Sequence, residues 1–259
     1  MNIGIIGTGN IAAYLLEQVN ANYMADGRVT AIFGRNREVG SRLKKRFDID
    51  FHTDLEEFLK KPFDVVVEAV TVDAAGLFLK DVIVHKKDLI VSSIGVFKDT
   101  AFLNEMKELA KKNGTEIFLP SGAIGGLDIL QSAKALGGLE HVQITTRKSP
   151  ESLGMESDIE QTIFDGSANE AVEQFPKNIN VALVLAIAGI GAEKTKVRII
   201  VDPAIKQNTH TIEARGDFGN MRLQVENNPM QTNPKTSLLA ALSILAVLQN
   251  KGNALRIGN

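Results

Sequence analysis

The chain of 259 residues contains no cysteine at all. Without cysteine there is no disulfide framework, no thiolate metal site and no cysteine nucleophile, and we predict no metal site of any kind. The composition fits the reducing cytoplasm, where we expect the protein to be located. The formal net charge is only −2, so the sequence offers no broad basic surface and we expect no nucleic-acid partner.

Long apolar runs are also absent. The longest, residues 179–192, has fourteen residues, whereas a membrane-spanning helix needs about twenty. This run therefore predicts a buried helix, and no membrane partner is expected. The N-terminus lacks the basic region and cleavage site of a secretory signal, and internal repeats and low-complexity segments are missing as well.

The clearest positive feature is an apolar segment at the N-terminus that runs directly into Gly-x-Gly-x-x-Ala. Gly7 permits a tight turn, Gly9 removes the Cβ that would collide with phosphates, and Ala12 lets the helix pack close to the strand. Free N–H groups at a helix N-terminus bind a pyrophosphate. An ordinary glycine turn is the alternative, but a second apolar segment at βαβ spacing favours a dinucleotide site. We expect the cofactor to contact Gly7, Gly9, Asn10 and Ile11.

The end of the second apolar segment bears on the type of cofactor. NAD-selective sites usually place Asp or Glu there, where it binds the ribose hydroxyls, but this chain has Phe33-Gly34-Arg35-Asn36-Arg37. Without a carboxylate a 2′-phosphate is not repelled, and Arg35 can bind that phosphate through its planar guanidinium. The alternative is that Arg35 and Arg37 are solvated loop charges. We therefore favour NADP, or use of both cofactors, over strict use of NAD.

Helix and strand patterns alternate through the first 120 residues, as a doubly wound parallel sheet requires. Besides the opening strand, the predicted strands cover residues 29–33, 63–70, 88–94 and 116–119. The predicted helices cover residues 11–20, 53–60, 73–85 and 100–113. After Pro120 the pattern changes to strands bordered by Asp, Pro, Asn and Gly, which is typical of a mixed sheet.

In the second half, the predicted strands cover residues 142–147, 197–202, 209–215 and 221–226. The predicted helices cover residues 128–136, 168–174, 180–189 and 236–251. We therefore predict an α/β protein with a Rossmann-type doubly wound parallel sheet and an α+β catalytic domain that has a mixed sheet. The expected boundaries are residues 1–120 for the Rossmann domain, 121–232 for the catalytic domain and 233–259 for a C-terminal helix that returns to the first domain.

Four histidines are candidate bases. His52 lies in a polar turn, His85 at a helix end and His141 just before a strand, so these three are interpreted as surface or capping residues. His210 lies in a polar-rich strand and turn of the kind that lines a binding site. Histidine is the side chain best suited to exchange a proton near neutral pH. From the residues alone, a catalytic base and a buried strand residue are equally good interpretations of His210.

Four segments, spread in order over the chain, resemble signature segments of the L-aspartate dehydrogenase family. They are Pro120–Asp128, Phe175–Ala182, the Asn-x-His stretch at residues 208–219, and Asn233–Ser237. The resemblance implies a Rossmann domain with an inserted α+β catalytic domain. It also implies oxidation of L-aspartate to iminoaspartate with NAD or NADP, and a reversible amination of oxaloacetate. The imine either passes to quinolinate synthase for pyridine-nucleotide synthesis or hydrolyses to oxaloacetate and ammonia.

The resemblance also assigns roles to single residues. The active-site histidine of the family matches His210, and its small cofactor-contacting residue matches Ala123. Its cofactor-contacting asparagine matches Asn180, with Asn178 as a close alternative, and Asn233 is assigned to the cofactor as well. A small residue beside the nicotinamide leaves room for hydride transfer, and an amide can pair with the ring carboxamide. A crossover loop at residue 123 and a helix N-cap at residue 180 are the structural alternatives.

The reaction requires a base and a set of hydrogen-bond donors. Hydride leaves the α-carbon only after the ammonium has lost a proton, and His210, or a water that it holds, is the candidate base. The two carboxylates of the substrate need cationic or hydroxyl partners. The candidates are Ser121, Lys177, Thr209 and Arg215, among which the sequence does not choose.

Other interpretations remain open at this point. The family often has an acidic residue where this chain has Gly34-Arg35, which places NAD preference in doubt. A dihydrodipicolinate reductase would carry a paired-histidine motif. A sugar or homoserine dehydrogenase would carry a Lys-Pro pair near residue 95. This sequence has neither motif. A cofactor-sensing protein without turnover is a further alternative. Because two-domain dehydrogenases commonly pair, we expect a homodimer that acts on a small-molecule substrate.

Overall fold

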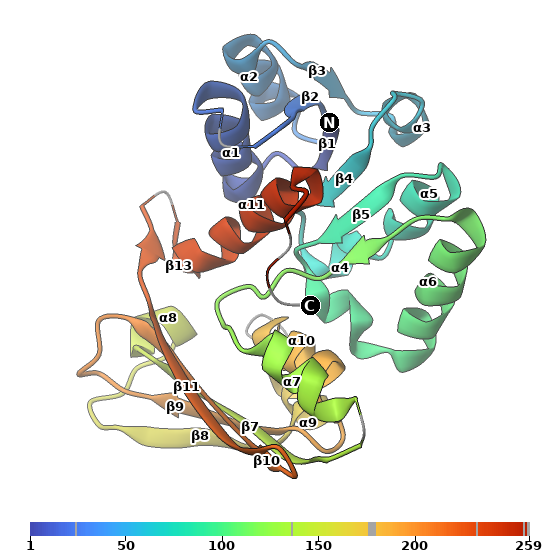
Figure 1. Cartoon of the computed structure of the whole chain (residues 1–259). Helices are drawn as coiled ribbons and strands as arrows, with labels where there is room; N and C mark the ends of the chain where they lie inside the picture. The colour runs from blue at the N-terminus through green and yellow to red at the C-terminus, as the bar shows by residue number, and fades with distance from the viewer. Residues whose placement is uncertain (24, 136, 176–179, 232, 256, 258–259) are drawn as a thin grey trace. The chain divides into compact units, whose positions relative to one another are not determined.

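A computed structural model describes the chain except for residues 24, 136, 176–179, 232, 256 and 258–259. The chain divides into two compact units (Figure 1). The first unit comprises Met1–Pro120 together with Ala241–Arg256, and the second comprises Ser121–Ala240 together with Ile257–Asn259. The chain thus leaves the first unit after Pro120 and returns to it within its last helix.

The first unit contains a six-stranded sheet in which every neighbouring pair of strands is parallel, in the order β3-β2-β1-β4-β5-β6. This order confirms the predicted Rossmann-type sheet. The strand order reverses between β1 and β4, and in such sheets ligands bind at this point, beyond the carboxyl ends of the strands. The strands are β1 (Asn2–Ile6), β2 (Arg28–Phe33), β3 (Asp50–His52), β4 (Val65–Glu68), β5 (Asp88–Val91) and β6 (Ile117–Phe118).

The helices of the first unit agree only in part with the sequence prediction. Helix α6 has the predicted bounds, but the helix expected over residues 73–85 is two helices, because the chain turns at Gly76, a residue of low helix propensity. Helix α2 was not predicted, and the side chain of Asn36 caps it by accepting a hydrogen bond from Val39 N. The elements are α1 (Asn10–Leu16), the π-helix η1 (Glu17–Ala21), α2 (Arg37–Phe47), α3 (Leu55–Leu59), α4 (Val72–Ala75), α5 (Leu79–Val84), η2 (Ile94–Lys98) and α6 (Thr100–Asn113).

The last helix, α11 (Leu238–Gly252), belongs to the first unit from Ala241 onward. Its residues Ile244, Leu245 and Leu248 are buried in one hydrophobic cluster with side chains of β1, α1 and α2. Lys251 forms an ion pair with Asp88, at the start of β5. Helix α11 is therefore part of the core of the Rossmann unit. Among the described residues, no helix is both long enough and apolar enough to cross a membrane.

The second unit contains a five-stranded mixed sheet in the order β11-β10-β7-β9-β8, in which only β7 and β9 are parallel. This arrangement confirms the predicted mixed sheet. The strands are β7 (Leu139–Lys148), β8 (Gln161–Ser167), β9 (Lys196–Val201), β10 (Asn208–Gly216) and β11 (Gly219–Asn227), and a small separate sheet pairs β12 (Pro229–Met230) with β13 (Asn233–Ser237). The helices are α7 (Leu127–Lys134), α8 (Pro150–Leu153), α9 (Ala168–Gln174) and α10 (Asn180–Ala188).

Helices α7, α9 and α10 cover one face of this sheet (Figure 1). Every second residue is buried from Val142 to Thr146 on β7 and from His210 to Ala214 on β10, as the alternation of side chains along a strand requires. On β7 the buried residues include Val142, Ile144 and Thr146, and on β10 they include His210, Ile212 and Ala214. His210 thus lies on the same buried face as the apolar core of the second unit.

Candidate functional site

The glycine-rich turn combines two glycines with different roles. Gly7 has φ +134°, and a Cβ at this position would lie 2.4 Å from the carbonyl oxygen of Ala69. Gly9 precedes α1 with an ordinary φ of −82°, and no atom lies within 4 Å of the place where its Cβ would be. The helix start at Gly9 has no side-chain cap. Open space in front of uncapped N–H groups suits a pyrophosphate, so these residues fit a dinucleotide.

Arg35 follows β2 at the edge of the sheet where the glycine-rich turn lies. The preceding residue, Gly34, brings the two segments together, since a Cβ on it would lie 2.6 Å from the Thr8 side chain. The Arg35 side chain is exposed, and it makes no ion pair within the described part of the chain. Asn10 is exposed and Ile11 half-buried in the first turn of α1. The first unit therefore presents an exposed guanidinium beside the candidate pyrophosphate site.

Glu68 is an addition from the structure at the same edge of the sheet. It ends β4 and is fully buried. Its two carboxylate oxygens accept hydrogen bonds from Val70 N at 2.8 Å and from Ser93 N at 2.9 Å, and the Ser93 hydroxyl donates to Val70 O at 2.8 Å. Glu68 therefore ties the loop after β4 to the loop after β5. The signal in the sequence was an acidic residue inside an otherwise apolar strand.

Burial raises the pKa of Glu68 above its ordinary value of 4.5. The folded protein therefore holds this proton more tightly than the unfolded chain does, and the contribution of Glu68 to stability decreases as the pH rises above 4.5. The decrease is at most about 1.4 kcal/mol per pH unit. Because Glu68→Gln removes the ionisation, we expect the free energy of unfolding of the wild type, relative to the variant, to fall as the pH rises from about 5 to about 7.

Urea denaturation at a series of pH values measures this difference. Glu108→Gln removes an exposed carboxylate on α6 and is the matched control for the loss of one acidic residue. Parallel stability curves for the wild type and Glu68→Gln would contradict the prediction.

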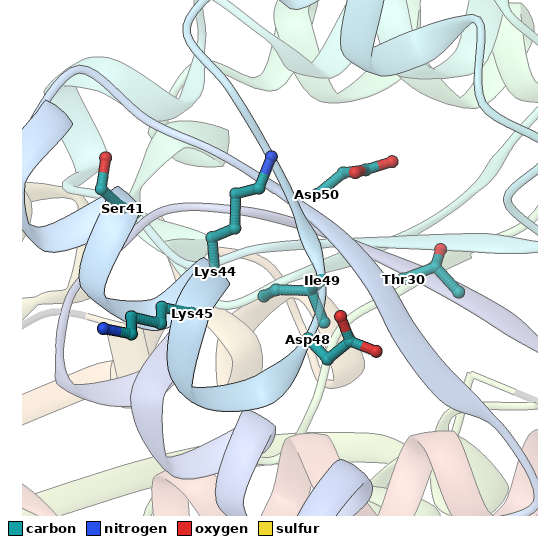
Figure 2. Close-up of a pocket in the computed structure, with 7 residues that line it drawn as sticks. All are labelled: Thr30, Ser41, Lys44, Lys45, Asp48, Ile49 and Asp50. Carbon is teal, nitrogen blue, oxygen red and sulfur yellow. The ribbon is translucent and has the colours of Figure 1, made fainter.

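The first unit also has a cavity of 650 Å³, which is not lined by the glycine-rich turn or by Arg35. Figure 2 shows that its lining comes from the end of α2, the start of β3 and the middle of β2. The start of β3 is the amino end of a parallel strand. Gly7 and Arg35 lie at the opposite edge of the sheet, at the carboxyl ends of the strands. The cavity is lined by charged residues of both signs, and one of them, Asp50, forms an ion pair of 2.7 Å with Lys61. The lining residues are Thr30, Ser41, Lys44, Lys45, Asp48, Ile49 and Asp50.

In the second unit, His210 lies on β10 directly opposite Thr146 of β7. Its Nδ1 is 3.0 Å from the Thr146 hydroxyl oxygen, with which it shares a hydrogen bond. The side chain is only 4% exposed. Burial, and secondarily the positive charge of Lys148, lower the pKa of His210 to about 3. The imidazole is therefore neutral at physiological pH, as a proton acceptor must be.

The segment around Ala123 is anchored to the same sheet. Ala123 is buried, and its carbonyl oxygen accepts a hydrogen bond of 3.0 Å from the side-chain amide of Asn227, at the end of β11. The amide oxygen of Asn227 in turn accepts a hydrogen bond of 2.7 Å from the Ser237 hydroxyl. Both polar side chains are buried. Asn227 and Ser237 therefore hold in place the segment that the sequence assigned to the nicotinamide.

The remaining predicted site residues are not all brought together. Thr209 and Arg215 lie an odd number of residues from His210 on β10, so their side chains point to the opposite face of the sheet. There, Arg215 is exposed, with its Nε 3.9 Å from a Glu140 carboxylate oxygen. Ser121 is half-buried in the Ala123 segment, and Lys177 and Asn178 lie outside the described residues.

Two asparagines assigned to the cofactor lie within the second unit. Asn180 is the first residue of α10 and is half-buried. Asn233 begins β13, where its side-chain amide donates a hydrogen bond of 2.8 Å to the Thr236 hydroxyl.

Comparisons with known proteins agree with the fold and with the sequence motifs. Residues 128–251 match the family "Aspartate dehydrogenase, C-terminal", and residues 7–120 match "Homoserine dehydrogenase, NAD binding domain". The chain is 38% identical to L-aspartate dehydrogenase of Archaeoglobus fulgidus over 96% of this chain and 97% of that one. It is 35% identical to L-aspartate dehydrogenase of Methanospirillum hungatei over the full length of both.

Among the solved structures, too, an aspartate dehydrogenase is similar to this chain. The crystal structure of aspartate dehydrogenase from Thermotoga maritima is similar with a TM-score of 0.82 and 30% identity, over 100% of this chain and 99% of that one. The scyllo-inositol dehydrogenase of Lactobacillus casei, solved with NAD(H), has a TM-score of 0.60 at 11% identity over 97% of this chain and 88% of that one, and shares the fold alone. The resemblance drawn from the four sequence segments is thus confirmed, and the chain belongs to the L-aspartate dehydrogenase family.

Proposed function

We propose that this protein oxidises L-aspartate to iminoaspartate by transferring a hydride from the α-carbon to NAD or NADP. The observation that carries the proposal is the similarity to L-aspartate dehydrogenases over almost the whole chain. Incubation of the purified protein with L-aspartate and either cofactor, followed by the absorbance of the reduced nicotinamide, tests it. Cofactor binding without reduction would instead support a sensing protein.

The nicotinamide ring, when bound, supplies the hydride acceptor. The free N–H groups after Gly9 would hold the pyrophosphate, and Ala123 would leave room beside the ring for the substrate. The amide of Asn180 would bind the ring carboxamide. His210 accepts a proton from the substrate ammonium, after which the nitrogen lone pair forms the C=N bond as hydride leaves the α-carbon. The released imine hydrolyses in water to oxaloacetate and ammonia.

The hydrogen bond to Thr146 supports this role for His210. When Nδ1–H donates to the Thr146 hydroxyl oxygen, Nε2 carries the lone pair and accepts the substrate proton. A pKa of about 3 makes the free imidazole a weak base. The negative charge of a dicarboxylate substrate beside the imidazole stabilises its protonated form. The pKa of His210 is therefore higher in the complex.

We further propose that the site accepts NADP, with Arg35 bound to the 2′-phosphate. Arg35→Ala removes a charged hydrogen-bond donor, so we expect the ratio of kcat/KM with NADP to kcat/KM with NAD to fall about tenfold or more. Steady-state kinetics with both cofactors measures this ratio. Arg42→Ala, on the exposed side of α2, is the matched control. An unchanged ratio in Arg35→Ala would mean that Arg35 is a solvated loop charge.

The assembly and the setting of the reaction are also part of the proposal. We infer a cytoplasmic homodimer that supplies iminoaspartate for pyridine-nucleotide synthesis. The absence of cysteine supports the location, and Leu242 of α11 leaves a large apolar side chain exposed. Light scattering after size-exclusion chromatography tests the dimer, and a monomer at micromolar concentration would contradict it.

A further inference from the structure

Glu68 is a buried acidic residue at the point where the strand order of the first sheet reverses. It ends β4, and its neighbours in the register are the last residues of the two adjacent strands, Ile6 of β1 and Val91 of β5. Ligands of such sheets bind at this point, beyond the carboxyl ends of the strands. The side chain is fully buried, and its two carboxyl oxygens accept hydrogen bonds from Val70 N and Ser93 N. One side chain thus connects the loops that follow β4 and β5.

The loop after β4 is held in two different ways along its length. Ala69 N donates a hydrogen bond of 2.8 Å to Ile6 O, and a Cβ on Gly7 would collide with the Ala69 carbonyl oxygen. The start of the loop is therefore fixed to the glycine-rich turn by backbone contacts. The next residue, Val70, is fixed by its hydrogen bond to the Glu68 side chain. Loss of the Glu68 carboxyl group would release Val70 and leave the turn in place.

The two halves of the sheet take different parts of a dinucleotide. A doubly wound sheet has two mononucleotide-binding halves, and the dinucleotide lies across the crevice between them. In the first half, the glycine-rich turn follows β1 and Arg35 follows β2, and we assign these to the pyrophosphate and to the adenosine 2′-phosphate. The loops after β4 and β5 belong to the second half. The nicotinamide nucleotide is the part of the cofactor that remains for the loops connected by Glu68.

The burial of a carboxyl group at this position needs a reason beyond the fold. Removing the group from water costs free energy that its hydrogen bonds return only in part. The other three residues of β4 are buried valines, so the strand is otherwise apolar. A carboxyl group has two acceptor oxygens, whereas an amide has one and an apolar side chain has none. What Glu68 adds is a fixed distance between two loops, as a ligand site on loops requires.

We propose that Glu68 is a positioning residue for the nicotinamide half of the cofactor, because it holds the loops after β4 and β5 in the conformation that receives this half. The inference rests on the proposed function, since it takes a nicotinamide dinucleotide as the ligand. Glu68 lies beneath the loops and acts through the backbone of Val70 and Ser93. The Ser93 hydroxyl, which donates to Val70 O, strengthens the same connection.

The test is Glu68→Gln in the full-length protein, under conditions where circular dichroism shows that the variant is folded. Glutamine keeps one acceptor oxygen but turns an NH2 group toward the second backbone N–H, so the connection is lost. We expect the Kd of NADH and of NADPH, measured by titration calorimetry, to rise about tenfold or more. The Kd of ADP, a fragment that ends at the pyrophosphate, should stay at the wild-type value. Glu108→Gln, exposed on α6, is the matched control for all three ligands.

The fluorescence of NADH gives a second readout, because its emission depends on the surroundings of the nicotinamide ring. With saturating protein, the emission of NADH bound to Glu68→Gln should shift toward that of free NADH, and Glu108→Gln should match the wild type. Ser93→Ala removes the bond to Val70 O but keeps both bonds of Glu68, so it should raise the Kd of the dinucleotides less than Glu68→Gln does. If Glu68→Gln does not fold, Ser93→Ala decides the inference through the same comparison of dinucleotides with ADP.

Wild-type affinity for NADH and NADPH in folded Glu68→Gln would overturn the inference. An equal rise in the Kd of ADP would overturn it as well, because Glu68 would then support the first unit as a whole. A wild-type protein that binds the cofactors but does not oxidise aspartate would instead overturn the proposed function. In that case the binding measurements still decide the role of Glu68.

Discussion

His210→Ala is expected to lower kcat for aspartate oxidation by about 10²- to 10⁴-fold, which is the usual contribution of a positioned general base. The imidazole sits opposite Thr146 on the buried face of the second sheet, where a hydrogen bond at Nδ1 fixes the ring. Alanine removes the proton acceptor but leaves the glycine-rich turn of the first unit untouched. The Kd of NAD or NADP should therefore remain at the wild-type value, as titration calorimetry measures.

The matched control is His141→Ala. His141 lies on β7 of the same sheet, an odd number of residues from Thr146. His141→Ala therefore removes an imidazole from the opposite face of the sheet. Its kcat should equal that of the wild type. Near-normal turnover in His210→Ala would remove His210 from the mechanism and would favour the interpretation that it is only a buried strand residue.

The burial of His210 has a second measurable consequence. Its pKa in the folded protein is about 3, below the ordinary value of 6.5. Between these values the unfolded chain binds a proton that the folded protein does not, so stability is lost as the pH falls below 6.5. The loss is at most about 1.4 kcal/mol per pH unit. Urea denaturation of the wild type and His210→Ala should show that part of the acid sensitivity disappears in the variant.

Local sequence patterns predicted much of the fold, because the features that they depend on are short in range. The apolar runs of β1, β4 and β5 and the glycine-rich turn were identified for this reason. Helix α2 and edge strand β8 were missed. The sequence of α2 is dominated by charged residues, and only the cap at Asn36 marks its start. Most side chains of β8 are not buried, so its apolar alternation is weak.

The candidate site depended on information that sequence spacing does not carry. Thr209 and Arg215 are close to His210 in sequence, yet strand alternation turns them to the other face. Thr146 is 64 residues from His210 along the chain, and Asn227 is 104 residues from Ala123, yet each pair shares a hydrogen bond. The pairing of β7 with β10 is what places Thr146 opposite His210. Because register follows from the assembled sheet, neither Thr146 nor Asn227 was identified beforehand.

The two glycines of the nucleotide-binding turn provide the second large effect. Gly9→Val places a branched side chain where the backbone approaches the pyrophosphate, so we expect the Kd of both cofactors to rise at least about 100-fold. The protein should still fold. The φ of −82° and ψ of −167° at Gly9 are allowed for valine, and no atom lies within 4 Å of the added Cβ. Calorimetry with NADP and with NAD, together with the Tm, measures both expectations.

Gly7→Val is the matched variant, and it should fail in the opposite way. A φ of +134° is disfavoured for any residue with a Cβ, and that Cβ would lie 2.4 Å from the Ala69 carbonyl oxygen. We expect a loss of about 3 kcal/mol or more in the free energy of unfolding, because strain and steric overlap add. The first glycine is thus required by the fold and the second by the ligand. If Gly9→Val bound both cofactors as tightly as the wild type, the pyrophosphate would have to lie elsewhere, and hydride transfer could not be assigned to this edge of the sheet.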